Sequence, residues 1–151
     1  MKDTLSLSKP NIYWPFGTSF LFLVPMTLAL AYTGQPDVAI ACFVCFLTSI
    51  STHYYKCENK MIRTIDIIIV NAIGVYYTFH SAFKMGLNAY TFFVYFFGIL
   101  ALIIYFLFRV LSFESIEPEK VKNCHSFVHL FANLGIVSYV YARYYIQIQS
   151  N

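Results

Sequence analysis

Long apolar runs separated by short polar segments dominate this sequence. The runs cover residues 16–32, 38–55, 65–83, 90–111 and 124–145. A helix needs about 20 apolar residues to cross a hydrocarbon core about 30 Å thick, and each run is close to that length. Strands of a membrane barrel would be about ten residues long and would alternate apolar with polar residues, which these runs do not. The pattern therefore predicts an all-α, multi-pass transmembrane bundle of about five membrane-spanning helices, with residues 1–151 forming a single domain.

The connections between these runs contain turn-forming and charged residues. Three short ones cover residues 33–37, 56–63 and 84–88, and the longest, 112–123, is also the most charged. The end of the first run, Ala29-Leu30-Ala31, resembles the cleavage site of a signal peptide. Because that run starts late in the chain, we expect a retained membrane helix that is kinked at Pro25.

The composition supports a membrane protein. Hydrophobic residues make up 59% of the chain and charged residues 11%. A water-soluble domain has about 25% charged residues, so an ordinary soluble fold is excluded. The net charge of +3 is small and scattered along the chain, which argues against nucleic-acid binding. The expected surroundings are therefore a lipid bilayer, and membrane lipids are the expected partners.

The basic residues predict an orientation in the membrane. With five spans, the N-terminus, the second connection and the fourth connection lie on the same side. That side carries eight of the ten basic residues: Lys2, Lys9, Lys56, Lys60, Arg63, Arg109, Lys120 and Lys122. The opposite side carries Lys84 and Arg143. The positive-inside rule then places the N-terminus in the cytoplasm and the C-terminus in the opposite compartment.

Five ionisable residues lie in or beside the apolar runs, where such groups are costly and often functional. His53 ends the second run, Asp66 begins the third, and His125 and His129 begin the fifth. Under the predicted topology, these four lie near the same membrane face. His80 lies at the other end of the third run, fourteen residues from Asp66, which is roughly 21 Å along a helix.

The spacing of the histidines suits a metal ion. His125 and His129 are four residues apart and lie on the same face of a helix, as two ligands of one ion would. With His53 as the third ligand, the set matches catalytic zinc sites in which three imidazoles leave a position for water. Asp66 would lie close enough to hydrogen-bond that water. Ser49, four residues before His53, would orient the water or the substrate carbonyl.

Plainer interpretations of the same residues stay open at this point. Two histidines four residues apart on a membrane helix also serve to hydrogen-bond neighbouring helices. Asp66 would also be favoured simply as a carboxylate in the first turn of its helix, next to the positive end of the helix dipole.

The ordered set Ser49-x-x-x-His53, Asp66 and His125-x-x-x-His129 resembles the motifs of the alkaline ceramidase and adiponectin-receptor superfamily of membrane hydrolases, which includes haemolysin III-like proteins. In that family the Ser and the first His end the second span, the Asp begins the third, and the His pair lies in the last. The resemblance implies that His53, His125 and His129 bind zinc, while Asp66 and Ser49 support the zinc-bound water as catalytic residues. It also implies hydrolysis of a lipid amide, such as a ceramide-like bond, or of a related acyl bond.

The family has seven spans, whereas this chain has five apolar runs. Loss of one helical pair between Asp66 and the last span would preserve the sidedness of the motifs, because two crossings cancel. It would also remove part of the lipid-binding cavity, so we expect a shortened member of the family.

Two other functional classes fit the same residues. One is a non-enzymatic multi-pass protein, such as a subunit of a complex or a membrane-remodelling factor, that keeps the histidines as a structural site. The other is a helical bundle that binds haem through two axial histidines. Metal analysis and an absorption spectrum, together with turnover of a lipid, separate these classes from a zinc hydrolase.

Overall fold

The chain forms five helical rods in a computed structural model that describes residues 14–54, 60–113 and 118–150. Every regular element in these ranges is helical, which confirms the predicted all-α class. The first rod comprises α1 (Trp14–Ser19), η1 (Phe20–Phe22), α2 (Leu23–Thr27) and η2 (Leu28–Tyr32). The other rods are α3 (Pro36–Tyr54), α4 (Lys60–His80) continued by η3 (Ser81–Met85), α5 (Ala89–Phe113) and α6 (Pro118–Gln149).

Three of these rods are long and apolar enough to cross a membrane. The stretches are Pro36–Tyr54, Thr64–Met85 and Ala89–Leu107. In the second and third of them only 17% of the apolar window is buried inside the protein. Phe16–Tyr32 in the first rod is a shorter apolar helix. These lengths are compatible with an integral membrane protein.

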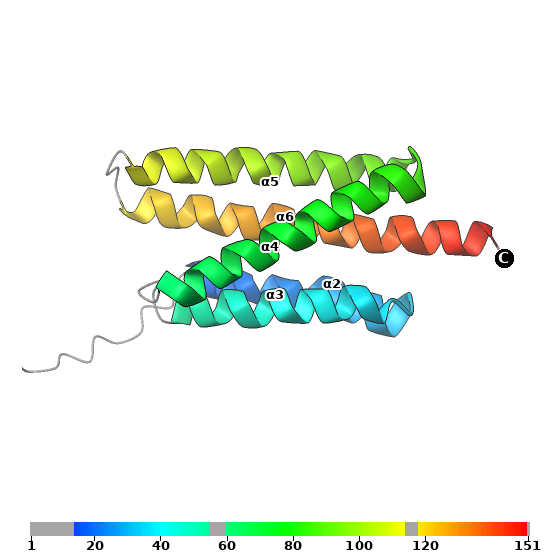
Figure 1. Cartoon of the computed structure of the whole chain (residues 1–151), viewed down its shortest axis with the longest axis horizontal. Helices are drawn as coiled ribbons and strands as arrows, with labels where there is room; N and C mark the ends of the chain where they lie inside the picture. The colour runs from blue at the N-terminus through cyan, green and yellow to red at the C-terminus, as the bar shows by residue number, and fades with distance from the viewer. Residues whose placement is uncertain (1–13, 55–59, 114–117, 151) are drawn as a thin grey trace, which may run out of the picture.

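Consecutive rods run in opposite directions. The first rod lies alongside α3, α5 lies alongside α6, and α4 crosses obliquely between the two pairs (Figure 1). As a result, α1, α4 and α6 begin, and α3 and α5 end, at one end of the bundle, which we call the α3–α4 end. The C-terminus lies at the opposite end. The fold therefore brings residues that are far apart in the sequence to the same end of the bundle.

The first rod departs from regular α-helix on both sides of Pro25. A 3-10 segment, η1, precedes α2, and a π-helical segment, η2, follows it. Proline has no backbone N–H, so it cannot donate the hydrogen bond that the preceding turn of an α-helix requires. The predicted irregularity at Pro25 thus coincides with a change in the hydrogen-bonding pattern of the helix.

The helices extend beyond the apolar runs into polar sequence. α4 begins at Lys60, five residues before the third run, and α6 begins at Pro118, inside the predicted connection 112–123. Pro36 and Pro118 each occupy the first position of a helix, where the missing N–H has no consequence. Hydropathy reports which part of a helix is apolar, and it does not report where the helix itself ends.

The protein core lies where the first rod, α3 and α6 meet. Phe22, Cys42, Cys45, Tyr139 and Val140 each have at most 1% of their surface exposed. Cys42 and Cys45 are free thiols. α4 contributes less to this core, because it crosses the bundle obliquely and keeps most of its surface exposed.

Candidate metal centre and adjoining cavity

Asp66 is held by two hydroxyl groups of the neighbouring helix. Thr48 and Ser49 of α3 donate hydrogen bonds of 2.9 and 3.0 Å to its Oδ1. Asp66 is 6% exposed and Ser49 is fully buried. Two donors converging on one oxygen fix the plane of the carboxylate and join α3 to α4. The structure therefore brings together the two residues that the sequence suggested as catalytic.

Asp66 is the seventh residue of α4, well past its first turn. The unpaired N–H groups and the positive end of the helix dipole belong to the first turn of a helix. The alternative interpretation of Asp66 as a helix N-terminal carboxylate is therefore wrong. What holds this buried carboxylate is hydrogen bonding from a second helix.

Two of the three predicted metal ligands lie side by side. His53, in the last turn of α3, and His129 of α6 are 4% and 5% exposed, and their ring centroids are 5.2 Å apart. Two imidazoles on one tetrahedral zinc ion, with Zn–N distances of about 2.0–2.1 Å, have ring centres about 5 Å apart. The separation of these rings therefore fits a shared zinc ion.

The ring of His129 is also held from the first rod. Thr18 Oγ1 shares a hydrogen bond of 3.2 Å with Nδ1 of His129, and the ring of Phe22 lies 5.8 Å from the imidazole, centroid to centroid. Metal-binding histidines usually engage their second ring nitrogen in such a contact, which fixes the tautomer and the ring orientation. Thr18 and Phe22 thus fix the orientation of the His129 ring from the first rod.

The third predicted ligand, His125, lies in α6 one turn before His129, but its side chain is outside the described part of the structure. Among the described residues, no group of three or more His, Cys, Asp or Glu side chains is placed to hold a metal ion. Coordination by His53, His125 and His129 together thus stays a prediction, with the first and last of these already adjacent.

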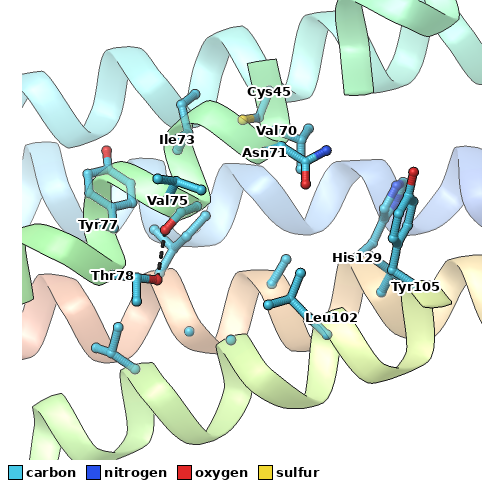
Figure 2. A pocket seen from close by; sticks show the side chains of 18 of the residues that line it. Cys45, Val70, Asn71, Ile73, Val75, Tyr77, Thr78, Leu102, Tyr105 and His129 are labelled. Atoms are coloured by element: carbon cyan, nitrogen blue, oxygen red, sulfur yellow. Dashed lines mark hydrogen bonds between the residues drawn. The ribbon is translucent and has the colours of Figure 1, made fainter. Parts of the chain in front are cut away.

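An apolar cavity of about 300 Å³ adjoins these residues. It is lined mainly by α4, α5 and α6, and Asp66 and His129 are among its lining residues. Figure 2 shows His129 and Tyr105 toward one end of the cavity and Tyr77 and Thr78 toward the other. The carboxylate of Asp66 and the imidazole of His129 thus lie on the side of the α3–α4 end, and aliphatic and aromatic side chains form most of the remaining wall.

Two residues that contact the site were missed by the sequence analysis. Thr48 directly precedes Ser49, and a single threonine in an apolar run does not indicate which residue its hydroxyl group will contact. Thr18 stands between Gly17 and Ser19, so this polar interruption near the start of the first run was a usable signal. Asn133, one turn after His129, donates a hydrogen bond of 2.8 Å to the backbone oxygen of His129.

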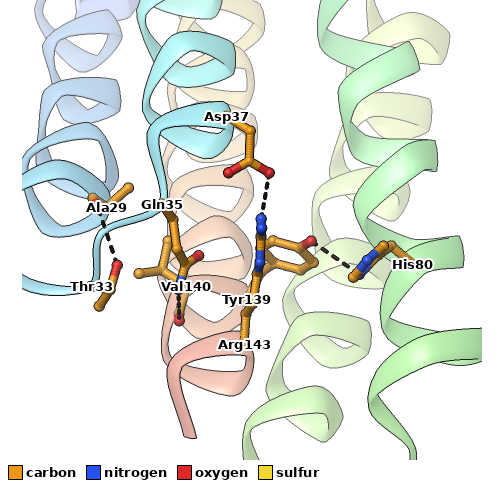
Figure 3. Close-up of polar contacts among 8 residues, drawn as sticks. All are labelled: Ala29, Thr33, Gln35, Asp37, His80, Tyr139, Val140 and Arg143. Carbon is orange, nitrogen blue, oxygen red and sulfur yellow. Dashed lines mark hydrogen bonds and ion pairs between the residues drawn. The ribbon is translucent and has the colours of Figure 1, made fainter. Parts of the chain in front are cut away.

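A separate polar cluster lies at the opposite end of the bundle (Figure 3). The hydroxyl of Tyr139 and Nδ1 of His80 are hydrogen-bonded at 3.1 Å, and Arg143 forms an ion pair with Asp37. These contacts join α4 and α3 to the C-terminal half of α6. The structure thus places His80 in a different cluster from His53 and His129.

The α3–α4 end therefore combines a carboxylate fixed by hydroxyl groups with two adjacent imidazoles, beside an apolar cavity. Comparison with protein-family models, curated proteins and solved structures finds no match to this chain.

Proposed function

We propose that this protein is a zinc-dependent intramembrane hydrolase that acts on a lipid amide, such as a ceramide-like bond, or on a related acyl bond. The observation that carries the proposal is that Asp66 and His129 line an apolar cavity, with His53 beside His129. A ligand site of this kind joins an apolar wall to a few converging polar groups. A lipid would place its scissile bond at these groups and its hydrocarbon chain in the cavity.

The proposal includes a five-span topology with the N-terminus in the cytoplasm and the C-terminus in the opposite compartment. Support comes from the alternating direction of the rods, which puts the starts of α1, α4 and α6 at the same end (Figure 1). The segments that connect to this end carry eight of the ten basic residues. The positive-inside rule assigns such an end to the cytoplasm.

His53, His125 and His129 would hold the zinc ion, and Thr18 would orient the ring of His129 through Nδ1. Zinc bound there would polarise the scissile carbonyl and make a water molecule more acidic. Three imidazole ligands leave a coordination position open, as catalytic zinc sites require.

Asp66 would be the general base. Its Oδ1 accepts the hydrogen bonds of Thr48 and Ser49, whereas Oδ2 accepts none from the described residues. Oδ2 is therefore the atom that would take a proton from the attacking water and pass it to the leaving amine. Ser49 donates its single hydroxyl hydrogen to Asp66, so in this mechanism it positions the carboxylate.

The test uses protein purified without chelators, with elemental analysis, an absorption spectrum and turnover of a ceramide-like amide. His129→Ala should lose zinc and turnover. His80→Ala is the matched control and should keep both, because His80 lies in the opposite cluster. Zinc without turnover would support the non-enzymatic alternative with a structural metal site. A Soret band in place of zinc would support the haem-binding alternative.

A further inference from the structure

Three glycines line the cavity, one from each of its main walls: Gly74 on α4, Gly98 on α5 and Gly135 on α6. A Cβ atom added at Gly135 would lie 3.7 Å from Cβ of Phe97 and 3.9 Å from the backbone nitrogen of Gly98. Gly135 thus stands where α5 and α6 approach closely. A Cβ atom added at Gly74 or Gly98 would meet nothing within 4 Å.

Neither packing nor backbone geometry accounts for Gly74 and Gly98. Both lie inside regular helices, and the described glycines with positive φ are Gly34 and Gly86. Glycine inside a helix is less favourable than alanine by about 1 kcal/mol. What the two positions share is that both line the cavity; Gly98 is half-buried and Gly74 is exposed.

The two glycines lie well away from the carboxylate of Asp66 and the imidazole of His129. Gly74 is eight residues after Asp66, roughly 12 Å along α4. Gly98 adjoins Gly135, which is six residues after His129, roughly 9 Å along α6. Beyond them lies Tyr77, which is 5% exposed and stacks on Tyr139 with ring centroids 4.3 Å apart.

The cavity is open along part of its wall, where Gly74, Val75 and Ile99 are exposed, and it encloses room for part of one hydrocarbon chain. Its volume is about 300 Å³. A methylene group takes up about as much space as a water molecule in the liquid, ~30 Å³, so about ten of them fill the cavity. The occupant that fits is one saturated chain whose polar end group stays at Asp66 and His129, because most of the wall beyond them is apolar.

We infer that Gly74 and Gly98 set the length of the acyl chain that this cavity accepts. The inference rests on the proposed function, since the chain is the acyl part of its substrate. A Cβ atom at either position would displace no neighbour, so we expect a larger side chain there to take up part of the cavity that these residues line. Chains longer than the space would have to withdraw their polar end from Asp66 or leave the cavity.

The experiment is photolabelling of the full chain in lipid nanodiscs. The probes are saturated fatty acids of increasing length, each with a diazirine on its last carbon, and adducts are mapped by mass spectrometry. In the wild type, we expect saturable adducts on cavity-lining residues of α4, α5 and α6 for chains up to about ten carbons. Longer chains should label lipid or the outer helix faces instead.

Gly98→Leu adds four carbons to the cavity wall and should lower this length limit by about four carbons. If Gly98→Leu fails to fold, Gly74→Leu tests the same inference from α4. The smaller change Gly98→Ala should lower the length limit by about one carbon. Gly17→Leu is the matched control, since a Cβ atom added at Gly17 would also meet nothing within 4 Å, and Gly17 does not line the cavity.

An unchanged length limit in folded Gly98→Leu or Gly74→Leu protein would overturn the inference, as would wild-type labelling on outer faces at every length. The proposed function fails separately. A length limit that shifts as expected in a protein without zinc or turnover leaves the chain site standing and removes the hydrolase. Zinc and turnover without any limit on chain length would support the hydrolase and would remove the inference about the two glycines.

Discussion

Replacing Asp66 by Asn separates the structural role of this carboxylate from its proposed chemical role. The amide oxygen of Asn can take the place of Oδ1 and accept the hydrogen bonds that Thr48 and Ser49 now donate at 2.9 and 3.0 Å. The amide NH₂ then replaces Oδ2, which removes the proton acceptor. We expect Asp66→Asn to retain zinc and to lower the rate of hydrolysis by about 10²- to 10⁴-fold, the usual contribution of a general base.

The effect on stability is expected to be small for Asn and larger for Ala. Interhelical hydrogen bonds in membrane proteins contribute about 0.6 kcal/mol each on average and up to about 1.7 kcal/mol. Asp66→Ala loses two of them, so unfolding should become easier by about 1–3 kcal/mol. In Asp66→Ala, Thr48 is free to donate its single hydroxyl hydrogen to the backbone oxygen of Cys45, 3.2 Å away, which favours the lower part of that range. Asp66→Asn should change the free energy of unfolding by less than about 1 kcal/mol.

The assay compares the wild type with both variants in the same detergent. Denaturant unfolding gives stability, elemental analysis gives zinc content, and release of fatty acid from a ceramide-like amide gives the rate. If Asp66→Asn unfolds as easily as Asp66→Ala, the negative charge itself is structural. If Asp66→Asn hydrolyses the amide at the wild-type rate, the assignment of Asp66 as general base is refuted.

Three further predictions address the metal ligands and the topology. Ala substitutions of His53, His125 or His129 should each lower the zinc content measured by elemental analysis, whereas His80→Ala should leave it unchanged. Thr18→Val removes the polar partner of His129 Nδ1 and should weaken zinc affinity by about 10- to 100-fold in a competition titration with a chelator; an unchanged affinity would show that Thr18 does not orient the ligand. Tags on the two termini should be accessible from opposite sides of sealed membranes, with the N-terminal tag on the cytoplasmic side; two tags on the same side would rule out five spans.

The sequence alone predicted the helical class and the approximate position of each rod. Both follow from local physics, because a helix satisfies its own backbone hydrogen bonds and a run of about 20 apolar residues matches the thickness of a bilayer. The sequence did not predict where the helices end. α4 and α6 continue into polar sequence at Lys60 and Pro118, since helical hydrogen bonding does not stop where the apolar sequence stops.

For the candidate site, the sequence indicated the residue types and tertiary structure decided their partners. The spacing of His125 and His129 and the order of Ser49, His53 and Asp66 were visible in the sequence. The convergence of Thr48 and Ser49 on one oxygen of Asp66, and the contact of Thr18 with His129, depend on how three helices are rotated and packed.

The cavity is the clearest case of a feature that only the tertiary structure determines. In the sequence, Gly74 and Gly98 are isolated glycines in apolar runs, and nothing local distinguishes them from Gly17. Their role depends on tertiary structure, because α4 crosses the bundle obliquely (Figure 1) and lines the cavity together with α5 and α6. Hydrophobic patterning encodes which residues avoid water, but a void is a property of several helices together, because it depends on which side chains fail to meet.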